Sequence, residues 1–497
     1  MKTLNLFFII TLFASVIFAD GVEPAGSGIE ADPYQIETLD NLLWISTNND
    51  SWDKYYVQTS NIDATETQNW NNGFGFSPIG FDYDNSFLGQ YSGQEHIIYN
   101  LFTSSIDNDI GLFGYSNGAI ISNLGLNNVN ISGHNSVGSL VGTSNNSIIS
   151  NCYSTGIVSG NSGIGGLIGL IDEDSIISDS YSFANVNGNL HSIGGLVGKN
   201  YDSIIMNCNS TGNIIGNESV GGLVGSTNYI SSIRLSFSTG NVTGVESVGG
   251  LVGRNTRSTI QNCYSSGNVN GSSFIGGFVG DCTIQSNIYK CYSNGTVDGA
   301  DGVGGFVGYI DNSSISNSFW DIETSGMVNS YGGTGKTTLE MKDVATYTDL
   351  STQGLSYPWD FVGNPYDDNN NEDYWDINNQ INNGYPFLTM FITGIVEELI
   401  QGNPEDSYLK RNYPNPFNPS TTIEFSIQNN SKVVLSIYNT KGQKIKTLTN
   451  SEITKGNHSI IWDGVDEFGD IVGSGIYYYK LKVNGKTKAV KKCLLLK

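Results

Sequence analysis

Gly194-Gly195-Leu196-Val197-Gly198 recurs in near-identical form along the middle of this 497-residue chain. Each copy contains two small residues, an apolar pair and a closing glycine. From Gly138 onward, the first glycines of successive copies are 27, 29, 27, 28, 27 and 28 residues apart. The copies occupy residues 137–142, 164–169, 194–198, 221–225, 249–253, 276–280 and 304–308, after a degenerate copy at 110–114. A fixed period of this length indicates an array of small structural repeats.

A second pattern, I-x-N-C/S-Y-S-x-G-x-V-x-G, completes each unit and starts at Ile149 in the first clear copy. Its fourth position takes only cysteine or serine: Cys152, Ser180, Cys208, Ser236, Cys263, Cys291 and Ser318. The position therefore needs a small residue and not a disulfide. An amide or carboxylate precedes it in most units: Asn123, Asn151, Asp179, Asn207, Asn262 and Asn317. These residues predict a partial ladder of stacked side chains.

The cysteines leave one alternative open. Cys263 and Cys291 are expected on adjacent coils about 4.8 Å apart, within the range that a disulfide can bridge. Cys282 is expected between them in a loop, where it could compete for either partner. Buried free thiols that act as small apolar residues are the favoured interpretation.

A unit of about 28 residues cannot bury its apolar side alone, so coils must stack and pair their backbones at about 4.8 Å. We predict an all-β, glycine-rich β-solenoid of about eight coils, roughly 40 Å long. The double glycines should provide corners with positive φ and a close approach between backbones. They are Gly165, Gly166, Gly194, Gly195, Gly221, Gly222, Gly249, Gly250, Gly276, Gly277, Gly304 and Gly305. A β-propeller needs about 40 to 50 residues per repeat, and the leucine-rich repeat motif is absent.

These units resemble the GLUG-motif repeats of bacterial surface proteins, closely over residues 111–326. Flanking segments fit the same pattern, namely Asp32-Pro33-Tyr34-Gln35-Ile36, Ser77-Pro78-Ile79-Gly80 and Asn317-Ser318-Phe319-Trp320-Asp321. The resemblance implies a cell-surface or secreted protein, often adhesin-like, of a class whose molecular roles are mostly unassigned.

The chain begins with the features of a signal peptide at 1–19: Lys2, an apolar run over 4–18 and a small residue at Ala19. No later run approaches the roughly 20 apolar residues of a membrane span, so we expect no transmembrane segment in the mature chain. Residues 20–109 are predicted to form an N-terminal cap and first coils, with an amphipathic helix over 36–45. Repeats follow at 110–326, a second, aromatic-rich cap at 327–393 and an acidic linker at 394–407.

Charge changes sign at this linker. The whole chain has a net charge of −24, whereas residues 408–497 contain 14 Lys+Arg and 6 Asp+Glu, a net of +8. The remainder therefore has a net charge of −32. An acidic body of this kind argues against nucleic acid as a partner.

Residues 408–497 alternate short strands with turns about every ten residues, which predicts an Ig-like β-sandwich. Its motifs are Tyr413-Pro414-Asn415-Pro416-Phe417-Asn418-Pro419, Asn439-Thr440-Lys441-Gly442, Trp462-Asp463-Gly464, Ser474-Gly475-Ile476-Tyr477-Tyr478-Tyr479-Lys480 and the final Lys491-Lys492-Cys493-Leu494-Leu495-Leu496-Lys497. With these motifs the module resembles the type A C-terminal sorting domain of the type IX secretion system. The resemblance implies export through the periplasm of a Gram-negative bacterium, after a Sec signal peptide, with the type IX machinery at the outer membrane as partner. The alternative is an ordinary Ig-like terminal domain. The sorting-signal residues implied are Pro414, Asn415, Pro416, Phe417, Asn418, Pro419, Gly475 and Tyr477.

Candidate chemistry is sparse. Residues 332–338 resemble a phosphate-binding loop, but Ser330 stands where the motif needs glycine, so we expect a turn. An oxygen-rich run at 367–373 is a weak Ca²⁺ candidate, because Glu372 and Asn378 break the loop pattern. Arg254 and Arg257 flank one coil turn and could contact an acidic ligand, although scattered surface charge is favoured. The calcium candidates are Asp367, Asp368, Asn369, Asn371 and Asp373.

No H-E-x-x-H or G-x-S-x-G motif occurs, and we predict no catalytic residue and no cofactor. The resulting prediction is a non-catalytic, secreted or cell-surface protein with an adhesin-like binding or structural role. Its extracellular ligand would be a glycan or a protein. The alternative is a polysaccharide lyase or glycosidase built on a β-helix.

Overall fold

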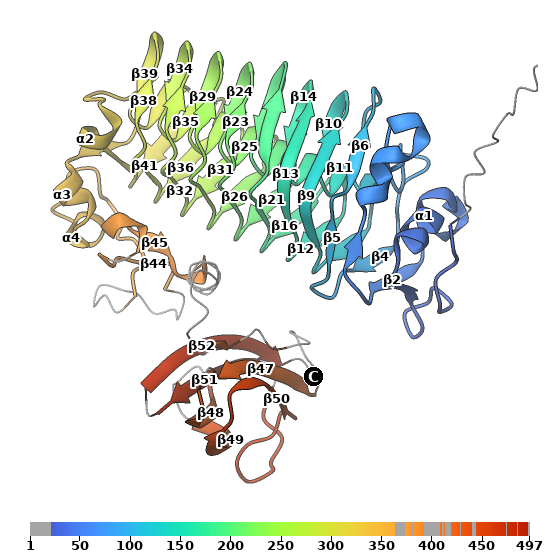
Figure 1. The fold of residues 1–497 in the computed structure, drawn as a ribbon. Helices are drawn as coiled ribbons and strands as arrows, with labels where there is room; N and C mark the ends of the chain where they lie inside the picture. Colours follow the sequence, from blue (N-terminus) through green and yellow to red (C-terminus); the bar gives the residue numbers. More distant parts are fainter. Residues whose placement is uncertain are drawn as a thin grey trace, which may run out of the picture. The chain divides into compact units, whose positions relative to one another are not determined.

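The computed structural model describes residues 21–362, 373–379, 381–391, 408–409, 412, 419–427, 429–439, 444–473, 475–484 and 486–495. The chain forms two compact units, Met1–Thr389 and Met390–Lys497. The first contains the repeats, which stack as successive coils (Figure 1). The predicted signal peptide and the predicted linker at 394–407 lie outside the described residues. Among the described helices, none is long and apolar enough to cross a membrane.

An 11-stranded parallel sheet runs the length of the solenoid. Three of its strands precede residue 110, so coiling begins well before the first recognisable copy of the repeat. Its strands are β1 (Tyr34–Ile36), β2 (Tyr55–Gln58), β4 (Gln90–Ser92), β8 (Ile120–Ser122), β12 (Ile148–Ser150), β16 (Ile176–Ser178), β21 (Ile204–Met206), β26 (Ser232–Arg234), β31 (Thr259–Gln261), β36 (Asn287–Tyr289) and β41 (Ser314–Ser316).

Two further parallel sheets carry the Gly-Gly-Leu-Val-Gly signature. The eight-stranded one contains β7 (Phe113–Asn117), β11 (Val141–Asn145), β15 (Ile168–Asp172), β20 (Val197–Tyr201), β25 (Val224–Asn228), β30 (Val252–Thr256), β35 (Val279–Thr283) and β40 (Val307–Asp311). The seven-stranded one contains β10 (Asn135–Val137), β14 (Ser162–Gly165), β19 (His191–Gly194), β24 (Glu218–Gly221), β29 (Glu246–Gly249), β34 (Ser273–Gly276) and β39 (Asp301–Gly304). The predicted β-solenoid of about eight coils is confirmed.

The second half of each unit forms a fourth set of parallel pairings. Its longer and N-terminal strands are β3 (Ile62–Asp63), β5 (Ile97–Tyr99), β6 (Phe102–Ser104), β9 (Gly125–Ser132) and β13 (Tyr153–Gly160). Later coils split it into β17 (Tyr181–Ser182), β18 (Asn185–Gly188), β22 (Asn209–Ser210), β23 (Ile214–Ile215), β27 (Phe237–Ser238), β28 (Val242–Thr243), β32 (Tyr264–Ser265), β33 (Val269–Asn270), β37 (Tyr292–Ser293), β38 (Val297–Asp298), β42 (Phe319–Asp321) and β43 (Thr334–Lys336).

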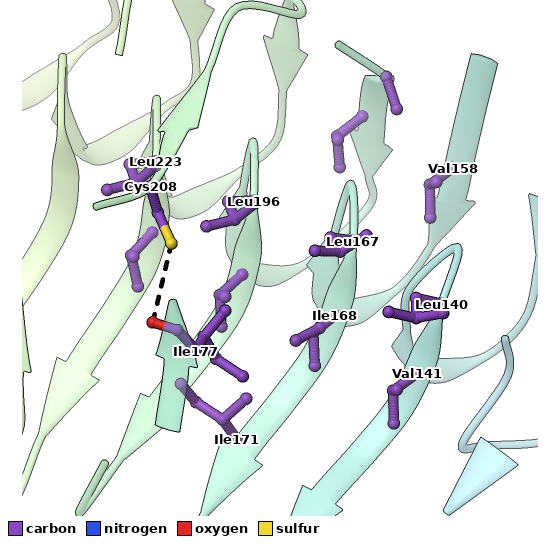
Figure 2. Close-up of a cluster of buried hydrophobic side chains, with 14 of the residues drawn as sticks. Leu140, Val141, Val158, Leu167, Ile168, Ile171, Ile177, Leu196, Cys208 and Leu223 are labelled. Carbon is purple, nitrogen blue, oxygen red and sulfur yellow. Dashed lines mark hydrogen bonds between the residues drawn. The ribbon is translucent and has the colours of Figure 1, made fainter. Parts of the chain in front are cut away.

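Equivalent residues of successive coils pair in register, and this register builds the core. Ile149 pairs with Ile121 on one side and Ile177 on the other, and all three are fully buried. Figure 2 shows Leu140, Leu167, Leu196 and Leu223 at equivalent positions of four coils. Each coil therefore adds the same apolar residues to continuous buried rows, the arrangement expected when one coil alone cannot form a core.

The double glycines do not have the predicted positive φ, and that part of the prediction is wrong. Their close approach to neighbouring backbone does occur. A Cβ on Gly194 would lie 2.1 Å from the Val197 carbonyl oxygen and 2.6 Å from the Gly225 nitrogen of the next coil. The missing Cβ is thus required by close backbone atoms, both within the same turn and on the next coil, and not by the local dihedral angles.

The residues predicted to form an amide ladder, and not the double glycines, have positive φ. Asn151 has φ 51° and Asn262 has φ 51°, and Leu235 and Lys290 hold equivalent corners at 51° and 54°. Asparagine tolerates this left-handed conformation better than most residues, which explains its frequency there. One ladder contact joins Asn207 Nδ2 to Asp179 Oδ1 at 3.3 Å. The main role of this row is therefore to form a left-handed backbone corner in each coil.

The helix near the N-terminus is α1 (Leu39–Thr47), three residues later than predicted, and Ile36 lies in β1 instead. Thr38 caps it and forms a capping box with Asn41. Leu42 and Ile45 are fully buried in the same apolar cluster as the coils. Short 3₁₀ turns follow at η1 (Asn49–Ser51), η2 (Thr65–Asn69) and η3 (Asn71–Gly73).

Beyond the last repeat, the chain first continues the coil and then turns back along its side. Strand β43 pairs in parallel with β42, and Ser330 Oγ accepts from Val307 N at 2.9 Å. The described elements after β42 are α2 (Ile322–Ser325), α3 (Thr338–Met341), α4 (Ala345–Thr348), β44 (Trp375–Asp376), η4 (Asn382–Gly384), β45 (Phe387–Leu388) and η5 (Thr389–Phe391). We call residues 337–391 the return segment.

Aromatic packing attaches the return segment to the coils. Phe237, Tyr264 and Tyr292 stack face to face on successive coils, with ring centroids 4.7 and 5.1 Å apart. The Trp375 ring lies 6.2 Å from that of Tyr264 and 6.0 Å from that of Tyr292, and it is fully buried. Its Nε1 donates to Asn262 Oδ1 at 3.3 Å.

The second unit is a sandwich of two antiparallel sheets around one apolar cluster that includes Phe425, Leu435, Trp462 and Tyr479. The predicted Ig-like β-sandwich is confirmed. One sheet contains β46 (Tyr408–Leu409), β47 (Thr421–Ile427) and β50 (Gly456–Trp462). The other contains β48 (Ser431–Asn439), β49 (Lys444–Ile453), β51 (Gly475–Val483) and β52 (Lys486–Leu495).

Candidate ligand-binding face

Two rows of outward-facing side chains, polar except for two isoleucines, follow the solenoid on either side of a buried aliphatic row that includes Val186, Ile214 and Val242. They occupy the x positions of the x-V-x pattern, which point outward because side chains alternate along a strand. The first row is Asn130, Ile157, Asn185, Asn213, Asn241, Asn268 and Thr296, and the second is Ser132, Ser159, Asn187, Ile215, Thr243, Asn270 and Asp298. We call these two rows the asparagine face.

Hydrogen bonds between coils hold the first row in a regular array. Asn185 Oδ1 accepts from the backbone nitrogen of Asn213 at 3.0 Å, and Asn241 Oδ1 accepts from that of Asn268 at 3.1 Å. Thr296 Oγ1 donates to Asn268 Oδ1 at 2.8 Å. With the Oδ1 atoms directed at the next coil, the Nδ2 groups are donors available at the surface at intervals of about 4.8 Å.

The face is almost uncharged. Of its fourteen side chains only Asp298 is charged, although the chain as a whole has a net charge of −24. Amide and hydroxyl groups on a flat, regular lattice provide many weak hydrogen bonds and little electrostatic attraction. Such a surface suits a neutral, extended ligand rich in hydroxyl groups.

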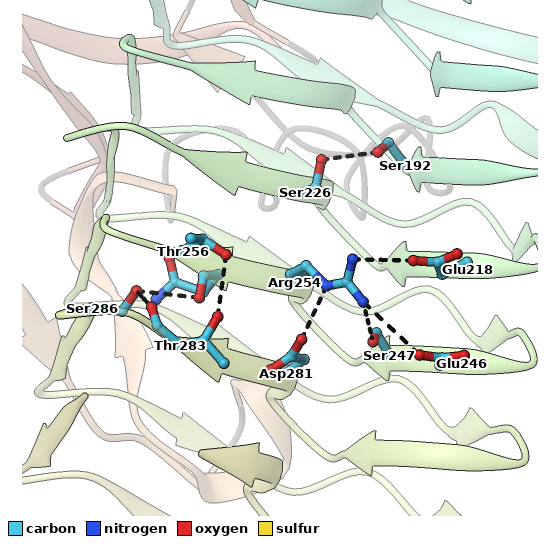
Figure 3. Close-up of polar contacts among 11 residues, drawn as sticks. Ser192, Glu218, Ser226, Glu246, Ser247, Arg254, Thr256, Asp281, Thr283 and Ser286 are labelled. Carbon is cyan, nitrogen blue, oxygen red and sulfur yellow. Dashed lines mark hydrogen bonds and ion pairs between the residues drawn. The ribbon is translucent and has the colours of Figure 1, made fainter. Parts of the chain in front are cut away.

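A different side of the solenoid contains an ion-pair cluster (Figure 3). Arg254 Nε lies 3.0 Å from Asp281 Oδ2, and its Nη1 lies 3.0 Å from Glu218 Oε1. Glu246 is 4.0 Å from Nη2. Burial raises the pKa of Asp281, an effect that Arg254 opposes. Because Arg254 is already surrounded by carboxylates, it is a poor site for an acidic ligand, and Arg257 packs over the Tyr229 ring instead.

The other predicted sites do not gather into one place. Asp367, Asp368, Asn369 and Asn371 lie outside the described residues, so of the calcium candidates only Asp373 is described. No group of three or more His, Cys, Asp or Glu side chains in the described ranges is arranged to hold a metal. The phosphate-loop resemblance falls on β43, where Lys336 is buried over the Phe319 ring.

Of the sorting-signal candidates, Pro414 to Asn418 lie outside the described residues. Pro419 lies two residues before β47, and Gly475 begins β51. Tyr477 is buried, packs edge-on against Trp462 and donates from its hydroxyl to the Gly473 carbonyl at 2.8 Å. In this structure Tyr477 supports the sandwich core.

All six cysteines are buried and free, as favoured from the sequence. Burial raises the pKa of Cys152 to about 12 and that of Cys282 to about 11. These thiols are therefore protonated and unreactive at neutral pH. Cys282 lies in β35 and not in a loop, because its strand pairs in register with β30 and β40.

Sequence reasoning missed the asparagine face, although the signal was present. Glycine, serine and valine recur from copy to copy and dominate the repeat pattern, whereas the positions beside the valine vary between copies. Their alternation with a buried aliphatic residue has the period of two that marks a strand with one exposed side.

Comparison with known proteins supports both parts of the architecture. Residues 189–215 and 244–270 match the GLUG motif, which confirms that resemblance. Residues 418–487 match the FlgD Ig-like domain, which supports the Ig-like fold without specifying a sorting role. Halomucin of Haloquadratum walsbyi is 38% identical over 124 residues, which are 23% of this chain and 1% of halomucin. The chain thus spans a very small part of that relative.

Among solved structures, an IgA1 protease is similar with 20% sequence identity and a TM-score of 0.39. The match covers 57% of this chain and 21% of the protease chain.

Proposed function

We propose that this chain is a secreted or cell-surface binding protein whose asparagine face holds a linear, uncharged polysaccharide along the solenoid. The observation that carries the proposal is the double row from Asn130 to Asp298, in which all but Ile157, Ile215 and Asp298 are amides or hydroxyls, nearly free of charge on an otherwise acidic chain. Its donors recur once per coil, so a polymer with regularly spaced hydroxyl groups can bond to several coils at once. Many weak contacts on one rigid lattice add up to useful affinity.

The test is a double substitution, Asn185→Asp with Asn241→Asp. Each aspartate still offers an oxygen to the backbone nitrogen of the next coil but replaces the Nδ2 donor with a carboxylate. The two sites are two coils apart, a distance of about 10 Å. At this distance salt screens much of the repulsion between the two introduced carboxylates. We expect binding to a neutral linear β-glucan to weaken about tenfold to a hundredfold, measured by affinity electrophoresis.

The matched control is Ser232→Asp with Asn287→Asp, which adds the same charge two coils apart on the 11-stranded sheet. This variant should migrate like the original chain in the glucan gel. Equal losses in both variants, or no retardation of the original chain by neutral glucans, contradict the proposal. Shortening of the polymer during the assay would instead support the polysaccharide-acting enzyme.

We further propose that the C-terminal unit directs export through the type IX secretion system of a Gram-negative bacterium. The signal-peptide pattern at 1–19, the motifs of 408–497 and the net charge of +8 on that module support this role. Deleting residues 408–497 should leave the chain in the periplasm of a type IX-competent host, as detected by fractionation and immunoblotting. Appearance of the truncated chain in the medium at the normal level would contradict the proposal.

A further inference from the structure

The coil that follows the last full repeat is incomplete. Its backbone bonds to the preceding coil at Tyr331, whose nitrogen donates to the Val307 oxygen at 3.3 Å. It bonds again at Thr334, whose nitrogen donates to the Ser318 oxygen at 2.9 Å. Ten residues lie between these two contact points in the full coil, but only two lie between them in the continuation. The continuation therefore lacks the strand that would pair with β41, the last strand of the 11-stranded sheet (Figure 1).

The outer edge of β41 has no backbone partner among the residues that the structure describes. The apolar residues at this edge are less covered than those of other coils. Ile310 and Ile315 are half-buried, whereas their counterparts one coil earlier, Cys282 and Ile288, are buried. An unpaired strand edge beside incompletely covered apolar side chains is a template for a further strand.

A pocket of about 360 Å³ lies beside β41. One wall runs from Ile315 to Ser318, and the other contains Gly333, Thr334 and Leu355. Thr334 begins β43, the strand at which the incomplete coil resumes its pairing. The pocket therefore occupies the place of the missing strand. None of the residues that line it is charged.

The surroundings of this edge are acidic. Residues 291–335 contain five Asp or Glu and no Lys or Arg. Asp301 at the start of β39 and Asp311 at the end of β40 are exposed, and neither forms an ion pair within the described part of the chain. An uncompensated negative potential favours a partner segment that carries Lys or Arg.

We propose that the outer edge of β41 accepts an extended, basic segment of another protein, which completes the final coil as a twelfth strand. Backbone hydrogen bonds to the edge provide much of the affinity, as in other cases of strand addition. An apolar side chain of the segment covers Ile315, and its basic side chains lie near Asp311. No residue of the asparagine face takes part, so this interaction goes beyond the function proposed above.

The chain itself provides the sequence of a suitable probe. Residues 252–261 have the same length as residues 307–316 and occupy the same register two coils earlier, with Ile260 equivalent to Ile315. They also contain Arg254 and Arg257 and no acidic residue. A fluorescein-labelled peptide of residues 252–261 should bind the full chain with a dissociation constant of about 1–100 μM, measured by fluorescence anisotropy.

A second peptide, with Ile260→Asp, tests whether the apolar contact at Ile315 matters. It should bind at least about tenfold more weakly, because a carboxylate would replace the side chain that covers Ile315. Equal affinity of the two peptides, or no binding of the first, overturns the proposal.

Ser316→Trp places a bulky side chain in the pocket from an exposed position. The affinity for the first peptide should fall at least about tenfold, with an unchanged melting temperature. The matched control is Ser178→Trp, at the equivalent position of β16, where other coils have Arg234 and Tyr289. This control should bind the peptide like the original chain. Unchanged affinity in Ser316→Trp would contradict strand addition at β41.

Sedimentation velocity of the chain alone distinguishes a separate partner from a second copy. We expect a monomer. A dimer that Ser316→Trp dissociates would place a second copy of the chain at the edge and overturn the proposed partner. The Asn185→Asp, Asn241→Asp variant should bind the peptide normally, so this proposal and the glycan-binding proposal can fail separately.

Discussion

Gly194→Ala is expected to lower the free energy of unfolding of the solenoid by about 4 kcal/mol, the range of severe core defects. The added Cβ would lie 2.1 Å from the Val197 oxygen and 2.6 Å from the Gly225 nitrogen, both backbone atoms. No rotamer change relieves contacts with backbone, so the turn from Gly194 to Val197 must distort and the next coil must move away locally, with loss of hydrogen bonds. Urea denaturation followed by far-ultraviolet circular dichroism measures the change.

The matched control is Gly163→Ser. Gly163 has φ 67°, and a Cβ there would meet no atom closer than 3.5 Å. Serine already occupies the equivalent corner at Ser192, Ser219 and Ser247 with φ between 55° and 62°. This variant should change stability by less than about 1 kcal/mol. If Gly194→Ala unfolds at the same urea concentration as Gly163→Ser, close packing between coils is not what the double glycines provide.

Trp375→Ala is expected to release the return segment from the coils. Truncating a fully buried tryptophan costs about 3–5 kcal/mol of stability. Here that free energy holds the return segment against the coils, so its loss favours local opening of this segment. The open form should become at least about a hundredfold more populated. Limited proteolysis with mass spectrometry should then show faster cleavage within 337–391, while the coils stay protected.

Tyr181→Ala is the control for this experiment. Tyr181 stacks on Tyr153 at 5.1 Å in a coil three repeats before Tyr264, so the return segment should be cleaved at the original rate. The cleavage rate of Trp375→Phe should lie between those of Tyr181→Ala and Trp375→Ala. Phenylalanine keeps most of the packing of Trp375 but loses the hydrogen bond to Asn262. Unchanged cleavage in Trp375→Ala would show that other contacts hold the segment.

The coil architecture could be predicted because one period repeats the same apolar positions. Once residues such as Ile149 and Ile177 are 28 apart, parallel stacking places them together and no other long-range information is needed. The same reasoning fails where a residue type has two uses. Glycine serves both left-handed corners and close contacts, and asparagine serves both corners and ladders. The close backbone contact of Gly194 is therefore predicted correctly but its positive φ is not, and the left-handed corner at Asn151 is not predicted.

The return segment could not be predicted for a different reason. Trp375 reaches Asn262, 113 residues earlier, and no periodic pattern links the two. The asparagine face, in contrast, follows directly from the alternation around Val186 and its equivalents once the coils are stacked.

The in-register pairing also makes each coil an interchangeable module. A residue pairs with its own counterpart in the coils before and after it, as Val186 does with Val158 and Ile214. Duplicating or deleting one whole unit of 27 to 29 residues would therefore leave every remaining position with the same kind of neighbour. The length of the asparagine face can change by unequal recombination within the gene, one coil at a time, without a new fold having to arise.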